Sequence, residues 1–337
     1  MNRERAAAAR AFLESAGWRG ALVETLTADA SFRSYYLVTH GERVAVLMDA
    51  PPEHEKPAAF QQVAEILMAL ELSAPRIYAA DSAAGFLLIE YFGERTFTRA
   101  LAAGADEQAL YQLATDTLIV LHRRWDPALG AALPSFDCQN LPAETDLFLD
   151  WTYPALTGKV ADELMRERFR DAWMEVLPPA FALPPTLVLR DYHVDNLMVL
   201  ADRPGVMACG LLDFQDALLG SPAYDLVSLL QDARRDVSPA VEAAMLERYC
   251  IAFPEMDHRL FEEAYWVLGA QRSIRILGVF VRLDRRDGKP AYLNHIPRLW
   301  RLLDRLLARP ELLPVAEWFE RYLPASARRA PLKGVAA

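Results

Sequence analysis

One stretch of the sequence, residues 186–220, constrains this chain more than any other. It reads TLVLRDYHVDNLMVLADRPGVMACGLLDFQDALLG. Three apolar runs in it each meet an oxygen-bearing side chain: Asp191 follows the first run, Asn196 opens the second and Asp213 ends the third. Short apolar runs bounded by turn residues are typical of buried strands. We therefore expect short strands that present polar groups, and not an ordinary solvated loop.

The last two apolar runs, 196–200 and 208–213, are placed to form an antiparallel hairpin. Their pairing would bring Asn196 roughly opposite Asp213. Amide and carboxylate oxygens are the hard ligands that Mg²⁺ prefers. Asp191, one loop away, would remain free to orient a hydroxyl and accept its proton. This combination is typical of phosphoryl transfer, which needs a positioned base and metal ligands but little covalent chemistry.

Composition limits the other possibilities. The chain has 337 residues, of which 53% are hydrophobic, so it can bury a large core and divide into two lobes. Its net charge of −10 disfavours a nucleic-acid partner. The 3 cysteines form no CxxC pair, which argues against a zinc knuckle or a disulfide framework. We see no signal peptide and no bilayer-spanning run, so we expect a cytoplasmic protein without a membrane partner. No feature of the sequence specifies an oligomeric state.

The order of expected elements changes character near residue 93. Before it, we expect helices at 3–16 and 56–72 and strands at 21–27, 35–40, 43–50, 75–80 and 86–92. After it, helical patterns dominate, at 106–124, 159–177, 240–252, 259–283 and 295–308. The hairpin described above is the only strand pair expected there. The sequence thus predicts an α+β fold with a small β-rich lobe (1–92), a large α-rich lobe (93–325) and a loose tail (326–337).

The motifs of the opening stretch resemble those of the aminoglycoside phosphotransferase family, whose fold is that of the protein kinases. RDYHVDN is similar to its D-x-H-x-x-N loop, LLDFQ to its metal-binding segment, and GSPAYDLVSLL to its GDPxxDLA helix opening. The resemblance covers about residues 21–310 and implies a bilobal kinase-like fold that uses ATP and Mg²⁺. It implies that Asp191 is the catalytic base, that Asn196 and Asp213 bind Mg²⁺, and that Asp225 is a structural carboxylate.

The nucleotide side of the resemblance is less regular. LLIEYFG (87–93) resembles the hinge that holds adenine, which makes Glu90, Tyr91 and Phe92 candidates for nucleotide binding. The phosphate loop DASFRS has no glycine, and Leu47 and Met48 stand where a kinase of this fold places its phosphate-binding lysine. We expect Arg33 to neutralise the phosphates instead, beside Ser31 and Phe32 of the same loop; Lys56, after a Pro-Pro break, suits this role less.

Two further segments, DASFRSYYLV…VLMDAPPE and residues 269–300, resemble one branch of the family. Members of that branch phosphorylate the anomeric hydroxyl of N-acetylmuramate and N-acetylglucosamine in cell-wall recycling, and they share the MDAPP segment without the strand lysine. This resemblance implies an amino-sugar acceptor.

The expected acceptor contacts are less specific. Arg272 and Arg275 share a helix face and could bind the lactyl carboxylate of N-acetylmuramate in bidentate fashion. Alternatively, they form structural ion pairs with acids such as Asp284 or Asp304. His193 could contact the acceptor or its own loop. Tyr153 could stack on a sugar or belong to the core.

Other functions remain open on the sequence alone. An aminoglycoside phosphotransferase is the nearest alternative, although arginines in 259–283 stand where a polycationic acceptor would call for acids. A choline, homoserine or fructosamine kinase is compatible with the fold, which hosts many substrates. A nucleotide-binding scaffold without turnover is suggested by the missing lysine and the glycine-free loop.

Overall fold

The computed structural model describes residues 3–26, 33–136 and 140–332. The chain packs into two compact units: residues 1–124 with 194–217, and residues 125–193 with 218–337. The expected division at residue 93 was drawn from element type, whereas packing assigns α3 (Phe97–Ala102) and α4 (Glu107–Arg124) to the first unit. The assignment of separate roles to two lobes therefore stays a prediction. Among the described residues, no helix is both long and apolar enough to cross a bilayer.

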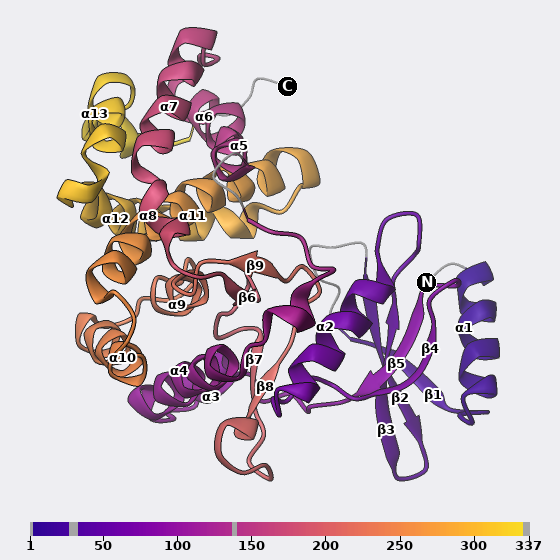
Figure 1. The fold of residues 1–337 in the computed structure, drawn as a ribbon. Helices are drawn as coiled ribbons and strands as arrows, with labels where there is room; N and C mark the ends of the chain where they lie inside the picture. The colour runs from indigo at the N-terminus through magenta and orange to yellow at the C-terminus, as the bar shows by residue number, and fades with distance from the viewer. Residues whose placement is uncertain (1–2, 27–32, 137–139, 333–337) are drawn as a thin grey trace. The chain divides into compact units, whose positions relative to one another are not determined.

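The first unit is built on a five-stranded antiparallel sheet in the order β1-β2-β3-β5-β4 (Figure 1). Its strands and the two helices beside it are β1 (Leu22–Thr25), β2 (Ser34–His40), β3 (Arg43–Asp49), β4 (Ile77–Asp81), β5 (Phe86–Glu90), α1 (Arg3–Ser15) and α2 (Pro57–Ala69). Alternate residues of a strand point to opposite faces of the sheet. On one face, Leu47 and Phe86 pack against Phe12 of α1, with the two phenyl rings stacked at 5.7 Å. Strands β3 and β5 are buried over most of their length, and their sequences are continuous apolar runs.

The predicted hairpin is present in the first unit, as β7 (Leu197–Val199) and β8 (Cys209–Leu211). Leu197 pairs with Leu211, so the next position out brings Asn196 opposite Leu212. The Leu212 amide donates to the Asn196 carbonyl at 3.0 Å. The sequence estimate placed Asn196 opposite Asp213, one residue further on, so the register is confirmed to within one position.

The second unit is helical and surrounds α11 (His258–Asp287), a helix of 30 residues (Figure 1). Gly278 lets α5 approach this helix, because a Cβ there would lie 2.5 Å from the Leu147 carbonyl carbon. Side chains at N-caps fix several helix starts; Asp257 accepts from the Leu260 amide at 3.0 Å. The other helices of this unit are α5 (Asn140–Leu147), α6 (Tyr153–Thr157), α7 (Glu163–Val176), α8 (Pro178–Ala182), α9 (Tyr224–Leu230), α10 (Pro239–Ala252), α12 (Ile296–Leu307), α13 (Leu313–Tyr322) and α14 (Ala325–Arg328).

Two expectations about the second part of the chain are wrong. A second strand pair exists, β6 (Thr186–Val188) with β9 (Leu218–Gly220). Each strand has only three residues, too few to show a periodic pattern, and their partners are distant in the sequence. The tail is also not loose up to Arg328, since that residue is buried and pairs with Asp304 at 2.9 Å. Residues 333–337 lie outside the described part of the chain.

Candidate active site

The hairpin of the first unit ends in the two predicted metal ligands. Asn196 precedes β7 and Asp213 follows β8 by two residues. The Asn196 amide nitrogen lies 3.5 Å from Asp213 Oδ2. Asp213 adopts a left-handed backbone with φ of 57°, a conformation that costs energy for a residue other than glycine and that recurs at functional sites. The hairpin thus brings together the two side chains that its apolar pattern predicts.

The Asp213 carboxylate is also held by two side chains. Arg33 Nη2 donates to Asp213 Oδ1 at 3.0 Å, and the Gln215 amide nitrogen donates to the same oxygen at 2.9 Å. Arg33 is 8% exposed and also lies 3.4 Å from Glu55. Burial works against the charge of Arg33, but nearby Tyr35, Asp213 and Glu55 outweigh it and raise the pKa of the guanidinium. In this arrangement Arg33 is the cation that balances Asp213.

The donor atoms of this cluster fit a magnesium ion that keeps water and phosphate ligands. The described residues contain no group of three or more His, Cys, Asp or Glu side chains placed for a metal. Mg²⁺, however, is usually bound by one or two protein carboxylates, with water and substrate phosphates completing the octahedron. Gln215 Oε1 adds an oxygen, because it is buried and has no hydrogen-bond partner within the described protein. Asp213, Asn196 and Gln215 would therefore hold the ion directly or through water.

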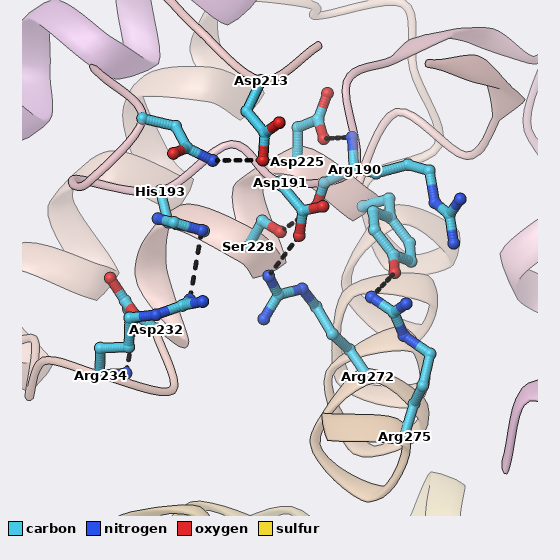
Figure 2. A network of polar contacts seen from close by, with 12 residues as sticks. Arg190, Asp191, His193, Asp213, Asp225, Ser228, Asp232, Arg234, Arg272 and Arg275 are labelled. Atoms are coloured by element: carbon cyan, nitrogen blue, oxygen red, sulfur yellow. Dashed lines mark hydrogen bonds and ion pairs between the residues drawn. The ribbon is translucent and has the colours of Figure 1, made fainter. Parts of the chain in front are cut away.

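In the second unit, the loop after β6 is fixed by the buried Asp225 (Figure 2). Asp225 accepts backbone hydrogen bonds from Leu189 at 2.7 Å and from Arg190 at 2.9 Å. The Ser228 hydroxyl donates to the Arg190 carbonyl at 2.6 Å. These contacts hold Arg190 at a φ of 70°, a left-handed conformation that the loop would not adopt unaided. They are the contacts that the predicted structural role of Asp225 requires, and they fix the backbone immediately before Asp191.

Asp225 is buried, and its ionisation reflects that. Its side chain is 1% exposed. Burial raises the pKa of Asp225 to about 7, against the two backbone hydrogen bonds, which lower it. A carboxyl group with this pKa changes charge near neutral pH.

Asp191 faces arginines that α11 supplies (Figure 2). Arg272 Nη2 lies 3.8 Å from Asp191 Oδ1, an ion pair without a hydrogen bond. The Asp191 side chain is 41% exposed, whereas that of Arg272 is 3% exposed. Burial opposes the charged form of Asp191, but Arg275 and Arg272 outweigh it and lower the pKa of the carboxyl group. Asp191 is thus an accessible carboxylate whose charged form the arginines of α11 favour, and Arg272 acts on it by charge and not by a hydrogen bond.

Arg275 is engaged by other partners. Its Nε lies 3.6 Å from Glu144 Oε2, and its Nη2 lies 3.5 Å from the Tyr224 hydroxyl. Glu144 also accepts from Arg190 Nη2 at 3.1 Å, so it links Arg275 to the loop of the predicted base. Arg272 and Arg275 therefore show the structural alternative of ion pairing, although with Asp191 and Glu144 and not with Asp284 or Asp304. Their role as acceptor ligands stays a prediction.

The remaining acceptor candidates, His193 and Tyr153, have different contacts. His193 is buried; its amide donates to the Asp191 carbonyl at 3.1 Å and its ring accepts from Arg234 at 3.2 Å. Tyr153 is 5% exposed in α6, and none of its recorded contacts is with the Asp191 loop. The geometry favours loop positioning for His193 and a core position for Tyr153.

Of the residues predicted to bind the nucleotide, only some lie in the described part of the chain. Glu90 ends β5; its amide donates to the Arg76 carbonyl at 2.8 Å and its carboxylate pairs with Arg203. The Arg203 guanidinium lies 5.0 Å from the Phe92 ring centre. Tyr91 is half-buried. Ser31 and Phe32 lie outside the described residues. Leu47 and Met48 are fully buried, so the position expected for a lysine serves the core.

Sequence reasoning missed several contributors, among them Gln215, Glu144 and Arg234. Gln215 lies two residues from Asp213, and the LLDFQ motif could have drawn attention to it. Glu144 and Arg234 carry no local signal, because their partners lie 46 and 41 residues away. Only packing of distant segments reveals them.

With this geometry established, comparison with known proteins places the chain. Residues 23–259 match the model of the phosphotransferase enzyme family. The chain belongs to this family. Solved structures share its fold: a choline kinase from Streptococcus pneumoniae has a TM-score of 0.62 at 14% identity, covering 88% of this chain and 97% of that one. An ADP-bound aminoglycoside phosphotransferase APH(2'')-Ib has a TM-score of 0.58 at 16% identity, covering 91% of this chain and 99% of that one.

Relatives within this phosphotransferase family are similar over most of their length. The chain is 39% identical to a protein of Caulobacter vibrioides named N-acetylmuramate/N-acetylglucosamine kinase, covering 98% of this chain and 99% of the relative. It is 36% identical to a protein of the same name from Pseudomonas aeruginosa, covering 86% of each chain. The predicted kinase-like α+β fold and phosphotransferase family are confirmed.

Proposed function

We propose that this phosphotransferase uses ATP to phosphorylate the anomeric hydroxyl of N-acetylmuramate and N-acetylglucosamine, yielding the sugar 1-phosphates in cell-wall recycling. The observation that carries the proposal is the 39% identity over 98% of the chain to a kinase named for these two sugars. Shared fold alone would not select a substrate, because the same fold occurs in the choline kinase and aminoglycoside phosphotransferase structures. We place the reaction in the cytoplasm, where ATP is available.

Asp191 acts as the base in this scheme. Its carboxylate accepts the proton of the anomeric hydroxyl while the hydroxyl oxygen attacks the γ-phosphorus in line with the leaving ADP oxygen. The lowered pKa of Asp191 keeps it ionised at neutral pH, and its side chain is 41% exposed, so an acceptor can approach it. Asp225 and Ser228 support this function by fixing the preceding backbone.

Asn196 and Asp213, with Gln215 beside them, would hold a magnesium ion. A bound Mg²⁺ neutralises charge on the transferring phosphates and orients them. Arg33, which balances Asp213 in this structure, is the guanidinium that we assign to the triphosphate. This assignment explains how a chain without the strand lysine supplies a cation for phosphate binding.

The direct test is an acceptor screen with purified protein and Mg-ATP. N-acetylmuramate, N-acetylglucosamine, kanamycin and choline are supplied separately, and ADP release is followed together with ³¹P NMR of the product. We expect ADP release with the two amino sugars and a phosphorus signal coupled to the anomeric proton. A product phosphorylated at another hydroxyl would refute the anomeric assignment. ATP binding without ADP release for any of the four acceptors would favour a nucleotide-binding scaffold instead.

A further inference from the structure

One face of α11 carries a row of arginines that begins at the partner of Asp191. At 3.6 residues per turn, positions 272, 275, 279, 282 and 286 fall within a sector of about 80° of the helix circumference. Four of the five are arginines, and the fifth is Val279. The exposure rises along this face: Arg272 is buried, Arg275 and Arg282 are half-buried, and Arg286 is exposed. The face therefore leads from the protein interior toward solvent.

Three of the four arginines have acidic partners, and Arg282 differs. Arg272 pairs with Asp191, Arg275 with Glu144, and Arg286 with Asp287 at 2.8 Å. Arg282 forms no hydrogen bond or ion pair with any residue that the structure describes, and its Nε is buried without a partner. A half-buried cation without a hydrogen-bonded or ion-paired acid is unusual for a side chain with only a structural role.

The neighbours of Arg282 make its charge less favourable. Burial, Arg286 and Arg275 all lower the pKa of this guanidinium, and Asp287 compensates only in part. The chain thus retains a guanidinium where a neutral side chain would pack without this repulsion. An anion from outside the protein would balance the charge. The guanidinium fork matches a carboxylate in bidentate geometry better than an ammonium would.

The C-terminal half of α11 is connected to the Asp191 loop by direct contacts within the second unit. Arg234 donates to His193, two residues after Asp191, and its guanidinium also lies 5.8 Å from the Phe280 ring centre. Arg282 follows Arg275 by two helical turns, about 10 Å along the axis. Because helical side chains lean toward the N-terminus, its guanidinium is carried back toward Arg275.

We propose that Arg282 binds the carboxylate of an acidic acceptor and thereby sets the preference for N-acetylmuramate over N-acetylglucosamine. The two sugars present the same anomeric hydroxyl, but only N-acetylmuramate carries the lactyl carboxylate. This inference rests on the proposed function. It moves the carboxylate contact from Arg272 and Arg275, whose charges Asp191 and Glu144 already balance, to the arginine of the row that lacks an acidic partner.

The test compares kcat/KM for both sugars in the wild type, Arg282→Ala, Arg282→Lys and the control Arg286→Ala. A charge-assisted contact of this kind predicts that Arg282→Ala lowers the N-acetylmuramate to N-acetylglucosamine ratio by about 10–100-fold. Arg282→Lys should restore part of the ratio, since it keeps the charge but not the fork. Arg286→Ala, one turn on and paired with Asp287, should leave the ratio unchanged.

The methyl ester of N-acetylmuramate provides the matching change in the ligand. The kcat/KM of the wild type should be lower for this ester than for N-acetylmuramate. The kcat/KM of Arg282→Ala should be the same for the acid and the ester. Equal effects of Arg282→Ala on both sugars, or an unchanged ratio, would overturn the assignment of Arg282 while the proposed function stood. If the wild type phosphorylated neither sugar, the proposed function itself would fail.

Folding of the variants is checked by thermal denaturation. Removal of a repelled, unbalanced charge should not lower Tm, so a loss of activity caused by unfolding is distinguishable. If Arg282→Ala did unfold, the wild-type comparison of acid with ester would still decide the question, because equal kcat/KM values for the two would refute a bound carboxylate.

Discussion

The two predicted carboxylates of the reaction, Asp213 in the first unit and Asp191 in the second, differ in how an arginine meets them. Arg33 donates a hydrogen bond to Asp213 at 3.0 Å, and Gln215 adds another at 2.9 Å. Arg272 stays 3.8 Å from Asp191 and forms no hydrogen bond with it. A carboxylate held by charge-assisted hydrogen bonds from an arginine must exchange that partner to bind a metal, whereas an arginine at a longer distance acts on its carboxylate through charge alone. An arginine beside an aspartate can therefore play two parts. We expect Arg33 to be a replaceable counter-ion of Asp213, and Arg272 to support the charge of Asp191.

The largest expected effect comes from removing either carboxylate. Asp191→Asn should lower kcat by roughly 10²–10⁴-fold, the usual contribution of a general base, and should leave ATP affinity measured by calorimetry nearly unchanged. Asp213→Asn should cost at least as much in kcat and should also weaken Mg²⁺-dependent nucleotide binding. Asp195→Asn is the matched control, because Asp195 lies in the same loop sequence and pairs with the Thr98 hydroxyl. Full activity in Asp191→Asn would exclude the scheme.

Arg33 separates the roles of counter-ion and phosphate ligand. In Arg33→Met, Asp213 loses its balancing cation, so Mn²⁺ should bind the nucleotide-free protein roughly 10-fold more tightly, as measured by electron paramagnetic resonance. ATP should bind roughly 10-fold more weakly, because the phosphates lose a guanidinium. Arg43→Met is the control, since Arg43 pairs with the Gly17 carbonyl. Changes of the same sign for metal and ATP would contradict the exchange of partners.

The sequence predicted only part of this difference between the two carboxylates. Alternating runs and turns predicted the hairpin and brought Asn196 to within one position of its observed register, because those features are local. The pairing of Arg33 with Asp213 joins residues 180 positions apart, and no periodicity reports such a contact. The sequence also did not predict β6 and β9, because each has only three residues and becomes a strand by pairing with a distant segment. The predicted roles of the site residues remain to be tested by the variants described here.

The arginines of α11 should set the acid limb of the pH profile. The base must be ionised, and its lowered pKa keeps it so at pH values below the ordinary range of Asp. Arg275→Met or Arg272→Met should raise the pKa of Asp191, so kcat/KM should begin to fall at a higher pH than in the wild type. A profile from pH 3 to 8 measures this shift, with Arg301→Met, which contacts Asp236, as the control. An unchanged acid limb in both variants would mean that the arginines do not act on Asp191 electrostatically.

The smallest expected effect concerns stability and Asp225. The folded-state pKa of about 7 exceeds the ordinary value of 3.8, so the folded protein holds this proton more tightly than the unfolded chain. The resulting stabilisation is fully present below the unfolded pKa and is lost as pH rises through about 7, by at most about 1.4 kcal/mol per pH unit. Asp225→Asn cannot titrate, so the stability advantage of the wild type over this variant should shrink between pH 5 and 8. Urea unfolding of both proteins at each pH gives that difference and cancels the titration of all other groups. If the difference in unfolding free energy between the wild type and Asp225→Asn stayed constant or grew with pH, the pKa of Asp225 would not be raised. The two backbone hydrogen bonds would then outweigh burial and keep the carboxylate ionised.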